Sequence, residues 1–271
     1  MPELPEVETT RRGIEPHLVG RTITAFTART PKLRLPLPED LSGQLVGQRV
    51  AEVVRRGKYL LVRCSAGCLI MHLGMTGHLR VVPTDTPAGR HDHVDLALDN
   101  GLLLRLTDPR KFGTLVWTAG EPLQHPLLAS LGPEPLEGGF DGAYLRAASS
   151  GRRVAIKPFL MDSRVVVGVG NIYASEALFR AGIDPARPAG ALSDRECTTL
   201  VEAVRSVLEE AITEGGTTLN EFLVGEERPG YFRLRLAVYG RAGEACPRCG
   251  AVILSNRLGG RSTCWCPVCQ R

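Results

Sequence analysis

Four cysteines near the carboxyl end constrain the fold of this chain more than any other feature. Cys246, Cys249, Cys266 and Cys269 follow the pattern C-x2-C-x16-C-x2-C. Each C-x2-C pair brings two thiolates onto one tight turn, and two such turns supply the four sulfur ligands of a structural zinc. Two disulfides are the alternative, but the first residues do not resemble a secretion signal, and reduced cytosolic thiols favour metal. We predict one structural Zn2+.

The segment between the two cysteine pairs carries two arginines, Arg257 and Arg261, and no acid. Two guanidinium groups on one short segment without a neighbouring acid are well placed to bind phosphate. Cys264 also lies in this segment, but we exclude it as a ligand because Cys266 completes the pair with Cys269. The remaining cysteines lie in apolar or helical contexts and are expected to be buried thiols: Cys64, Cys68 and Cys197.

Positive charge is concentrated at the same end of the chain. From Arg228 to Arg271 there are eight arginines and one acid, Glu244, so this end carries +7. The whole chain carries +4, which leaves −3 on residues 1–227. A basic end on a slightly acidic body suggests binding to a polyanion such as nucleic acid. A solvated basic surface is the simpler alternative.

The length of 271 residues favours two domains, each with its own core. No apolar run approaches the length of a membrane span, and the opening MPELPEVE is acidic. We therefore expect a soluble cytoplasmic protein without a membrane partner.

Between Thr22 and Trp117 the pattern is that of β-structure. Turn residues separate short β-rich runs, and 65–67 and 99–101 have the composition of hairpin turns. Strands at this spacing favour a sandwich or barrel. The runs are TITAFTA, RVAEVV, YLLVRC, LIMHL, HLRVV, HVDLAL, LLLRL and TLVW.

Helices are expected on both sides of this β-region. Pro5 suits a first helical turn, so a helix should begin almost at once. Residues 131–141, rich in glycine, proline and acids, are the predicted linker. After it, Ser193–Glu196 forms a capping box that opens the longest helix. Residues 168–171 open another helix whose first amides could hold an anion, although glycines here are more often a plain turn.

Pro2 has unusual chemistry if Met1 is removed. Its nitrogen then becomes a secondary amine that can attack the aldehyde carbon of a sugar and form an iminium ion. Such an amine titrates near pH ~8, so part of it is nucleophilic at physiological pH. Glu3 beside it could move protons. The alternative is that Pro2 merely follows the start residue, and with Met1 attached its nitrogen is an amide and cannot react.

The chain resembles the formamidopyrimidine-DNA glycosylase family, bacterial enzymes that remove oxidised purines. The matching segments run in order from residue 2 to residue 271: PELPEVETTRRGI, RRGKYLL, MHLGMTGHLR, TDPRKFG, GVGNIYASEALFRAGIDP and CPRCG with GGRSTCWCPVCQR. The related endonuclease VIII type typically opens Pro-Glu-Gly-Pro. Here Leu4 follows Glu3, which favours the oxidised-purine branch. The family more often has two aromatics before the third zinc ligand, where this chain has Cys264 and Trp265.

The resemblance implies an α+β multidomain fold. An N-terminal catalytic β-sandwich flanked by helices would occupy residues 1–130, with the linker at 131–141. A helix-two-turns-helix DNA-binding domain would follow at 142–235, and a β-hairpin zinc finger at 236–271. Within the second domain, residues 217–235 align with the family's lesion-capping loop.

The resemblance also implies roles for individual residues. Pro2 would be the nucleophile, Glu3 the acid and base, Lys58 the cation that supports strand cleavage and Arg261 the finger residue that grips phosphate beside the lesion. Met75, Arg110 and Phe112 would fill the space left by the flipped base; from the residues alone, Met75 and Phe112 would be assigned to the core. The remaining predicted DNA contacts are His72, His91, Arg152, Asn171 and Tyr239.

The reaction implied is covalent. Pro2 displaces the damaged base, and β- and δ-elimination then remove the sugar, leaving a one-nucleotide gap with phosphate at both ends. The implied partner is damaged double-stranded DNA, bound by a monomer acting at the bacterial nucleoid.

Two other functions remain open from the residues. One is a non-catalytic zinc-ribbon DNA-binding protein, in which Pro2 and Glu3 are incidental. The other is a metal-dependent nuclease that uses His72, His91 and His93, although the alternation of His91 and His93 on a strand favours structural roles. The preferred lesion, the stringency for the opposite base and the rate-limiting step are not fixed by sequence.

Overall fold

The computed structural model describes residues 2–215 and 236–271, and it divides into two compact units. The first contains residues up to Ala129, and the second contains the described residues from Ser130 onward. No helix among the described residues is long and apolar enough to cross a membrane.

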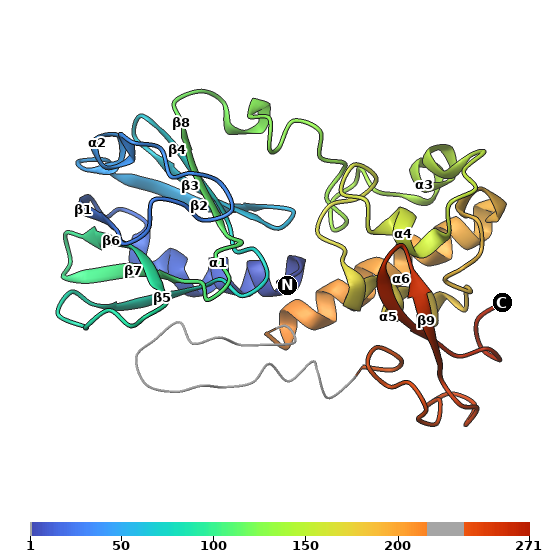
Figure 1. Cartoon of the computed structure of the whole chain (residues 1–271). Coiled ribbons are helices and arrows are strands. Elements are labelled where there is room, and N and C mark those ends of the chain that lie inside the picture. Colours follow the sequence, from blue (N-terminus) through green and yellow to red (C-terminus); the bar gives the residue numbers. More distant parts are fainter. Residues whose placement is uncertain (1, 216–235) are drawn as a thin grey trace. The chain divides into compact units, whose positions relative to one another are not determined.

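The first unit is built from two antiparallel four-stranded sheets, of order β1-β6-β7-β5 and β2-β3-β4-β8 (Figure 1). All eight predicted strands form where the β-rich runs place them, and both predicted hairpin turns are present. The elements are α1 (Leu4–Leu18), β1 (Ile23–Ala28), α2 (Leu41–Leu45), β2 (Val50–Arg56), β3 (Tyr59–Cys64), β4 (Gly67–His72), β5 (His78–Pro83), β6 (Asp92–Leu98), β7 (Leu102–Thr107), β8 (Thr114–Thr118) and η1 (Pro122–Gln124).

Helix α1 contacts both sheets, through β2 and β3 on one side and β5 on the other. Val7, Ile14 and Leu18 recur at helical spacing and are buried in the same core as the inward-facing strand residues. The predicted early helix start is confirmed at Leu4, with Pro5 in the first turn. This packing places Pro2 and Glu3 at a rigid helix end.

A fully buried arginine, Arg105 on β7, lies among the strands of the β1-β6-β7-β5 sheet. Its guanidinium donates two hydrogen bonds to Asp95, of 2.8 and 2.9 Å, and two more to the carbonyl oxygens of Thr86 and Pro87. Burial opposes ionisation of Asp95, but hydrogen bonds from Arg105 and Arg29 outweigh it and hold the pKa of Asp95 below its ordinary value. The stabilisation is present above the unfolded pKa of about 3.9 and is lost as pH falls through the lower native value.

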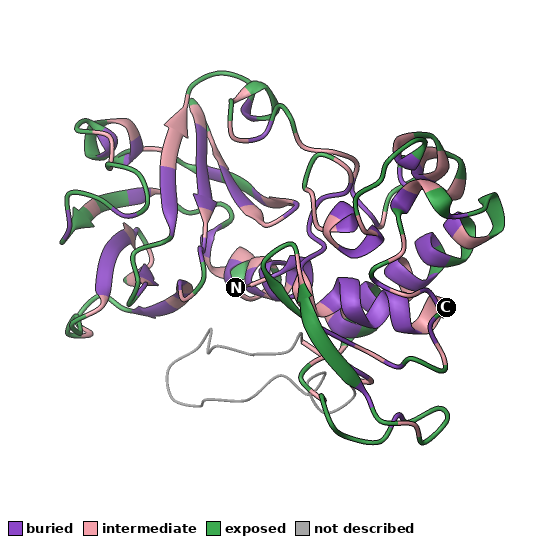
Figure 2. Ribbon diagram, turned by 45° about the vertical axis from the view of Figure 1, so that its right-hand side comes forward, coloured by how far each residue is buried: buried purple, intermediate pink, exposed green. Residues whose placement is uncertain are grey.

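The second unit is helical and ends in a hairpin. Its elements are α3 (Gly142–Ser149), α4 (Ile156–Leu160), α5 (Asn171–Ala181), η2 (Ala189–Ala191), α6 (Asp194–Thr213), β9 (Leu254–Leu258) and β10 (Arg261–Trp265). The predicted capping box at Ser193 and Glu196 opens α6. Helix α6 packs on α3 and α5, and α5 also contacts β10. Figure 2 shows that α6 buries one face, whereas β9 is largely exposed.

The segment 131–141, predicted from composition as a linker, belongs to the second unit and packs against its helix α6. Phe140 is fully buried, and Arg205 of α6 donates to the carbonyl oxygens of Pro135, Glu137 and Phe140. The glycines and prolines set the turns of this segment, and the arginine holds its backbone.

Replacing Arg105 by methionine should lower the free energy of unfolding of the first unit by about 3 kcal/mol, because the buried Asp95 would lose its two hydrogen bonds from Arg105 and keep only the ion pair with Arg29. Urea unfolding at pH 7 measures the change. Arg63 is the control: it makes a partly exposed ion pair with Glu52, so Arg63→Met should cost about 1 kcal/mol or less. Equal losses in the two variants would contradict the assignment.

Candidate active site and nucleic-acid interface

Helix α1 holds Pro2 and Glu3 at its amino end. Glu3 is the N-cap residue, and its backbone N–H donates to Glu6 Oε2 at 2.8 Å in a capping box. Pro2 is half-buried, and only 3% of Glu3 is exposed. A potential amine nucleophile and a carboxyl group are thus adjacent on a fixed backbone, as nucleophilic catalysis with proton transfer requires.

Lys58 lies in the two-residue turn, Gly57 and Lys58, that joins β2 to β3. Arg55 connects this turn to α1, because it donates to Glu8 at 3.3 Å and to the Gly57 carbonyl oxygen at 3.1 Å. Burial opposes ionisation of Glu8, but hydrogen bonds from Arg11 and Arg12 outweigh it and lower its pKa. The helix that carries Glu3 and the turn that carries Lys58 are therefore joined through one ionised carboxylate.

His72 is a neutral group beside Lys58. It pairs across the strands with Tyr59, with ring centroids 4.8 Å apart. Burial, followed by the positive charges of Lys58 and Arg34, lowers the pKa of His72 to about 4. The Gly74 N–H donates to Nδ1 at 3.0 Å, so in the neutral ring the proton is on Nε2. His72 can offer phosphate a hydrogen bond but no charge at neutral pH.

Met75, Arg110 and Phe112 lie on the loops that follow β4 and β7. Met75 is 38% and Phe112 39% exposed, so neither belongs to the core to which the residues alone would assign them. The Arg110 guanidinium lies over the Phe112 ring, 4.5 Å from its centroid. An apolar ring with a cation on its face can enter a gap in stacked bases and also meet polar base edges.

The two predicted histidines of β6 and its preceding loop differ in environment. His93 is buried, and its Nε2 lies 3.0 Å from the Asp108 carbonyl oxygen, in agreement with a structural role. His91 is partly exposed and meets His93 edge to face, at 6.4 Å between centroids. In the part of the chain that the structure describes, only four cysteines form a candidate metal cluster, so no histidine cluster supports a nuclease.

The four predicted cysteines, Cys246, Cys249, Cys266 and Cys269, converge on one point in the second unit, with all Sγ atoms within 4.8 Å of one another. Two of these separations are 3.9 Å, between Cys246 and Cys269, and 3.5 Å, between Cys249 and Cys266. Tetrahedral zinc with Zn–S bonds of about 2.3 Å requires sulfurs about 3.8 Å apart. The residues therefore fit zinc, and all eight cysteines are free thiols rather than disulfides.

Arg261 projects from the tip of the finger hairpin. Gly259 and Gly260 form a two-residue turn with φ of 54° and 75°, and Arg261 pairs with Leu258 directly after it. Both turn positions require positive φ, which glycine adopts without strain. Arg261 is the first residue of β10 and is exposed, so its guanidinium can bind phosphate.

Two buried charged side chains hold the finger, and sequence reasoning did not identify either. Lys157 of α4 is fully buried, and its Nζ donates to the Ser262 carbonyl oxygen at 3.0 Å and to Thr263 Oγ1 at 2.9 Å. Glu176 of α5 accepts hydrogen bonds from three consecutive backbone N–H groups, those of 237–239, at 2.8–3.0 Å. Lys157 thus fixes the strand next to Arg261, and Glu176 fixes the backbone of Tyr239. The only sequence signal for either was a charge inside an otherwise apolar helix.

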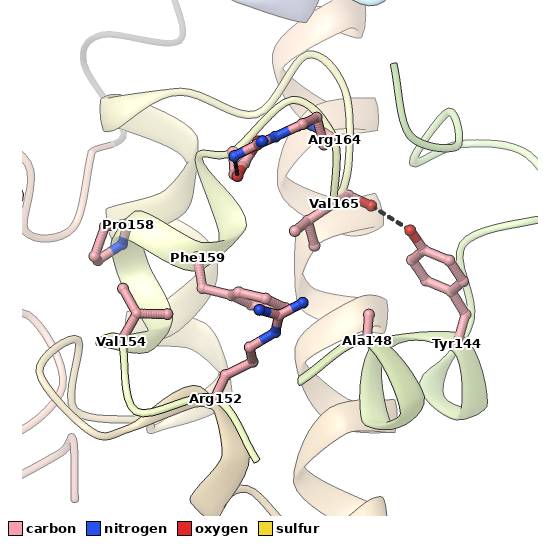
Figure 3. Close-up of a pocket in the computed structure, with 9 residues that line it drawn as sticks. Tyr144, Ala148, Arg152, Val154, Pro158, Phe159, Arg164 and Val165 are labelled. Carbon is pink, nitrogen blue, oxygen red and sulfur yellow. Dashed lines mark hydrogen bonds and ion pairs between the residues drawn. The ribbon is translucent and has the colours of Figure 1, made fainter. Parts of the chain in front are cut away.

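Asn171 is the first residue of α5, after the N-cap Gly170. Its Oδ1 is buried, with no hydrogen-bond partner among the described residues. Arg152 lines a pocket of about 450 Å3 in the same unit, with Tyr144, Phe159 and Arg164 (Figure 3). Tyr144 donates to the Val165 carbonyl oxygen across this pocket at 2.8 Å. The predicted capping loop, residues 217–235, lies outside the described residues.

The predicted site residues therefore form two groups. The first unit carries Pro2, Glu3, Lys58, His72, Met75, His91, Arg110 and Phe112, whereas the second carries Arg152, Asn171, Tyr239, Arg261 and the four cysteines.

Three family models match the chain in order. They are the formamidopyrimidine-DNA glycosylase N-terminal domain at residues 1–115, the formamidopyrimidine-DNA glycosylase H2TH domain at 131–222, and a zinc finger found in FPG and IleRS at 243–271.

Relatives and solved structures match over the whole length. The formamidopyrimidine-DNA glycosylases of Geotalea uraniireducens and Geobacter sulfurreducens are 62% and 59% identical, with all of each chain covered. A variant of the Lactococcus lactis FPG protein, solved in complex with DNA that contains Fapy-dG, is similar to this chain with a TM-score of 0.91 and 36% identity over 100% of both chains. The MutM protein of Thermus thermophilus gives a TM-score of 0.87 and 40% identity over 99% of this chain and 98% of the other.

His72 should remain neutral from pH 5 to pH 8, because its pKa is lowered to about 4 and the charged form appears only as pH falls toward that value. Nitrogen chemical shifts of the imidazole ring, recorded across this range, would show the proton on Nε2. An imidazolium at His72 at pH 6 would contradict the assignment.

The finger should separate metal binding from DNA binding. Cys249→Ser should lose zinc and DNA affinity together, whereas Arg261→Ala should keep zinc and lose about tenfold or more in affinity, because one charge-assisted phosphate contact disappears. Zinc content and fluorescence anisotropy with a DNA duplex measure the two effects. Arg248→Ala is the matched control, since Arg248 stacks on Phe179 and its loss should matter less. Normal binding by the Arg261 variant would reduce the finger to a structural element.

Proposed function

This chain belongs to the formamidopyrimidine-DNA glycosylase family, and from that premise we propose how its residues divide the reaction. It is a DNA glycosylase with AP lyase activity that acts in base excision repair, with DNA as its partner and one structural zinc. The substrates are oxidised purines in duplex DNA, namely 8-oxoguanine and formamidopyrimidines. The observation that carries the assignment of the chemistry is the position of Pro2, whose nitrogen becomes an amine once Met1 is removed, next to the buried Glu3 at the start of α1.

Pro2 is the nucleophile once Met1 has been removed. Its nitrogen lone pair forms a bond to C1′ of the damaged nucleotide, and the base leaves with the electrons of the glycosidic bond. Glu3 takes the proton that the Pro2 nitrogen loses and gives it to the sugar ring oxygen as the ring opens, which leaves an iminium ion between Pro2 and C1′. The capping box that fixes Glu3 supports this role, because general acid catalysis depends on position.

The iminium ion then drives strand cleavage. It withdraws electrons from C2′, so a base can remove the C2′ proton, and the C3′–O bond breaks with phosphate as the leaving group. A second elimination breaks the C5′–O bond. Lys58 and Arg261 stabilise the negative charge of the departing phosphates, and the product is a one-nucleotide gap with phosphate at both ends.

The remaining predicted contacts act in DNA binding. Met75, Arg110 and Phe112 fill the space vacated by the flipped nucleotide, with Phe112 as an apolar wedge and Arg110 facing the cytosine left unpaired, and their exposure and stacking support these roles. His72, His91, Arg152, Asn171 and Tyr239 contact the DNA backbone. Neutral His72, with its proton on Nε2, and the amide oxygen of Asn171, which has no hydrogen-bond partner among the described residues, are the observations that favour polar contacts there.

We further propose the domain division and the setting. The catalytic domain comprises residues 1–130, the linker 131–141, the helix-two-turns-helix domain 142–235, and the zinc finger 236–271. The change from strands to helices after Thr118 supports this division. The protein acts as a monomer, since one chain carries every residue assigned above, and it works in the bacterial cytoplasm at the nucleoid.

Borohydride trapping tests the mechanism. With a duplex that contains 8-oxoguanine opposite cytosine, the parent protein should form a covalent complex whose intact mass equals protein plus sugar-bearing DNA, because reduction fixes the iminium ion. Pro2→Gly should trap at least tenfold less. A form with a retained amino-terminal extension should not trap at all, since its Pro2 nitrogen is an amide. Absence of a complex with the parent would favour a non-catalytic DNA-binding protein, whereas equal trapping by Pro2→Gly would contradict the role of Pro2 as the nucleophile.

A further inference from the structure

A buried carboxylate, Asp108, lies beneath the loops that carry Met75, Arg110 and Phe112. It is the residue that follows β7, and none of its surface is exposed. No step of the reaction proposed above uses it. An ionisable side chain in such a position is retained at a considerable desolvation cost unless its oxygens are hydrogen bonded.

Both carboxylate oxygens of Asp108 bind the two loops. Oδ1 accepts from Thr76 Oγ1 at 2.6 Å, and Oδ2 accepts from the Gly113 N–H at 2.8 Å. Thr76 lies next to Met75 on the loop after β4, and Gly113 lies next to Phe112 on the loop after β7. One side chain therefore joins the backbones that carry the two exposed apolar groups.

The Thr76 hydroxyl extends this connection to Arg110. Because its single proton goes to Asp108, its oxygen accepts from the Arg110 N–H, at 3.2 Å. The backbone of Asp108 adds contacts to a third segment, since its N–H donates to the His91 carbonyl oxygen at 2.9 Å. Residues predicted to read DNA from three segments are thus linked to one buried residue.

The backbone of the two loops is in close contact. A Cβ on Gly74 would lie 2.4 Å from the carbonyl carbon of Phe112, so only glycine fits, and its φ is +64°. Lys111, between Arg110 and Phe112, has φ 55°, a conformation that non-glycine residues rarely adopt. Its N–H donates to the Asp108 carbonyl oxygen at 3.1 Å, which supports the reversal of the chain that stacks Arg110 on Phe112.

We propose that Asp108 is a positioning residue that, through Thr76, holds Met75, Arg110 and Phe112 as one insertion unit and so sets how strictly the enzyme discriminates the base opposite the lesion. The inference rests on the proposed function, because it takes from it the roles of the three exposed residues. Asp108 touches neither the reacting atoms nor the DNA. Its effect is exerted through the spacing and orientation of the groups above it.

Thr76→Val is the principal test, because valine keeps the shape of threonine and removes the proton donated to Asp108. Excision of 8-oxoguanine opposite cytosine should fall about tenfold in kcat/KM, and the preference for cytosine over adenine opposite the lesion should shrink by a similar factor, since one charge-assisted hydrogen bond is lost. Thr76→Ser retains the hydroxyl and should restore both values. A purely structural role would lower Tm without changing the preference.

A second readout isolates the chemistry of Pro2. Borohydride trapping on a preformed abasic site does not require removal of a base, so Thr76→Val should trap there within about twofold of the parent. Combining Thr76→Val with Phe112→Ala should add little to the effect of Phe112→Ala alone, because both changes act on the same insertion unit. Asp108→Asn is informative if it folds, and it should behave as Thr76→Val does.

The outcomes separate this inference from the proposed function. If the parent does not trap at all, the proposed function fails. If the parent traps and excises normally while Thr76→Val keeps its full rate and its preference for cytosine, only the role of Asp108 is refuted. Additive losses in the double variant would also refute it, since they would show that Thr76 and Phe112 act independently.

Discussion

Buried charged side chains that bind backbone groups hold the functional loops of both units. Arg105 fixes the segment at Thr86 and Pro87, Asp108 joins the loops that carry Met75 and Phe112, Lys157 fixes the strand beside Arg261, and Glu176 fixes the backbone at Tyr239. A buried charge is stable only when its partners are correctly placed. Each of these residues therefore specifies one loop geometry and penalises the alternatives, in a way that apolar packing, which is not directional, cannot.

Much of the fold could be predicted from local pattern. The eight strands follow from β-rich runs bounded by turn residues, the capping box at Ser193 opens α6, and the cysteine spacing gives the metal site because each ligand pair is local in sequence. Pro2 and Glu3 have suitable chemistry, but the dipeptide alone favours a proline that merely follows the start residue, and only the family resemblance assigns them roles. The same is true of the exposure of Met75 and Phe112: composition placed them in the core, and only the family resemblance reversed that assignment.

The supporting residues could not be predicted, because their partners are distant in sequence. Lys157 binds a strand more than one hundred residues later, and Glu176 binds backbone about sixty residues away. The one local signal, a charge inside a largely apolar helix, does not say which backbone groups the charge binds. The short helix α2 was missed for another reason, since five residues are too few to show helical periodicity.

The carboxylate of Glu176 determines whether free anions can bind to the backbone of residues 237–239, next to the zinc finger. Three consecutive backbone N–H groups that converge on one point form the kind of concavity in which proteins capture free anions. Here that place is already taken by an anion that belongs to the chain itself and is 2% exposed. Inorganic phosphate and nucleotides, which are abundant in any cell, therefore cannot bind these three N–H groups while Glu176 occupies them. The backbone N–H groups beside Tyr239 are therefore already occupied, and contact with DNA at this point is left to side chains.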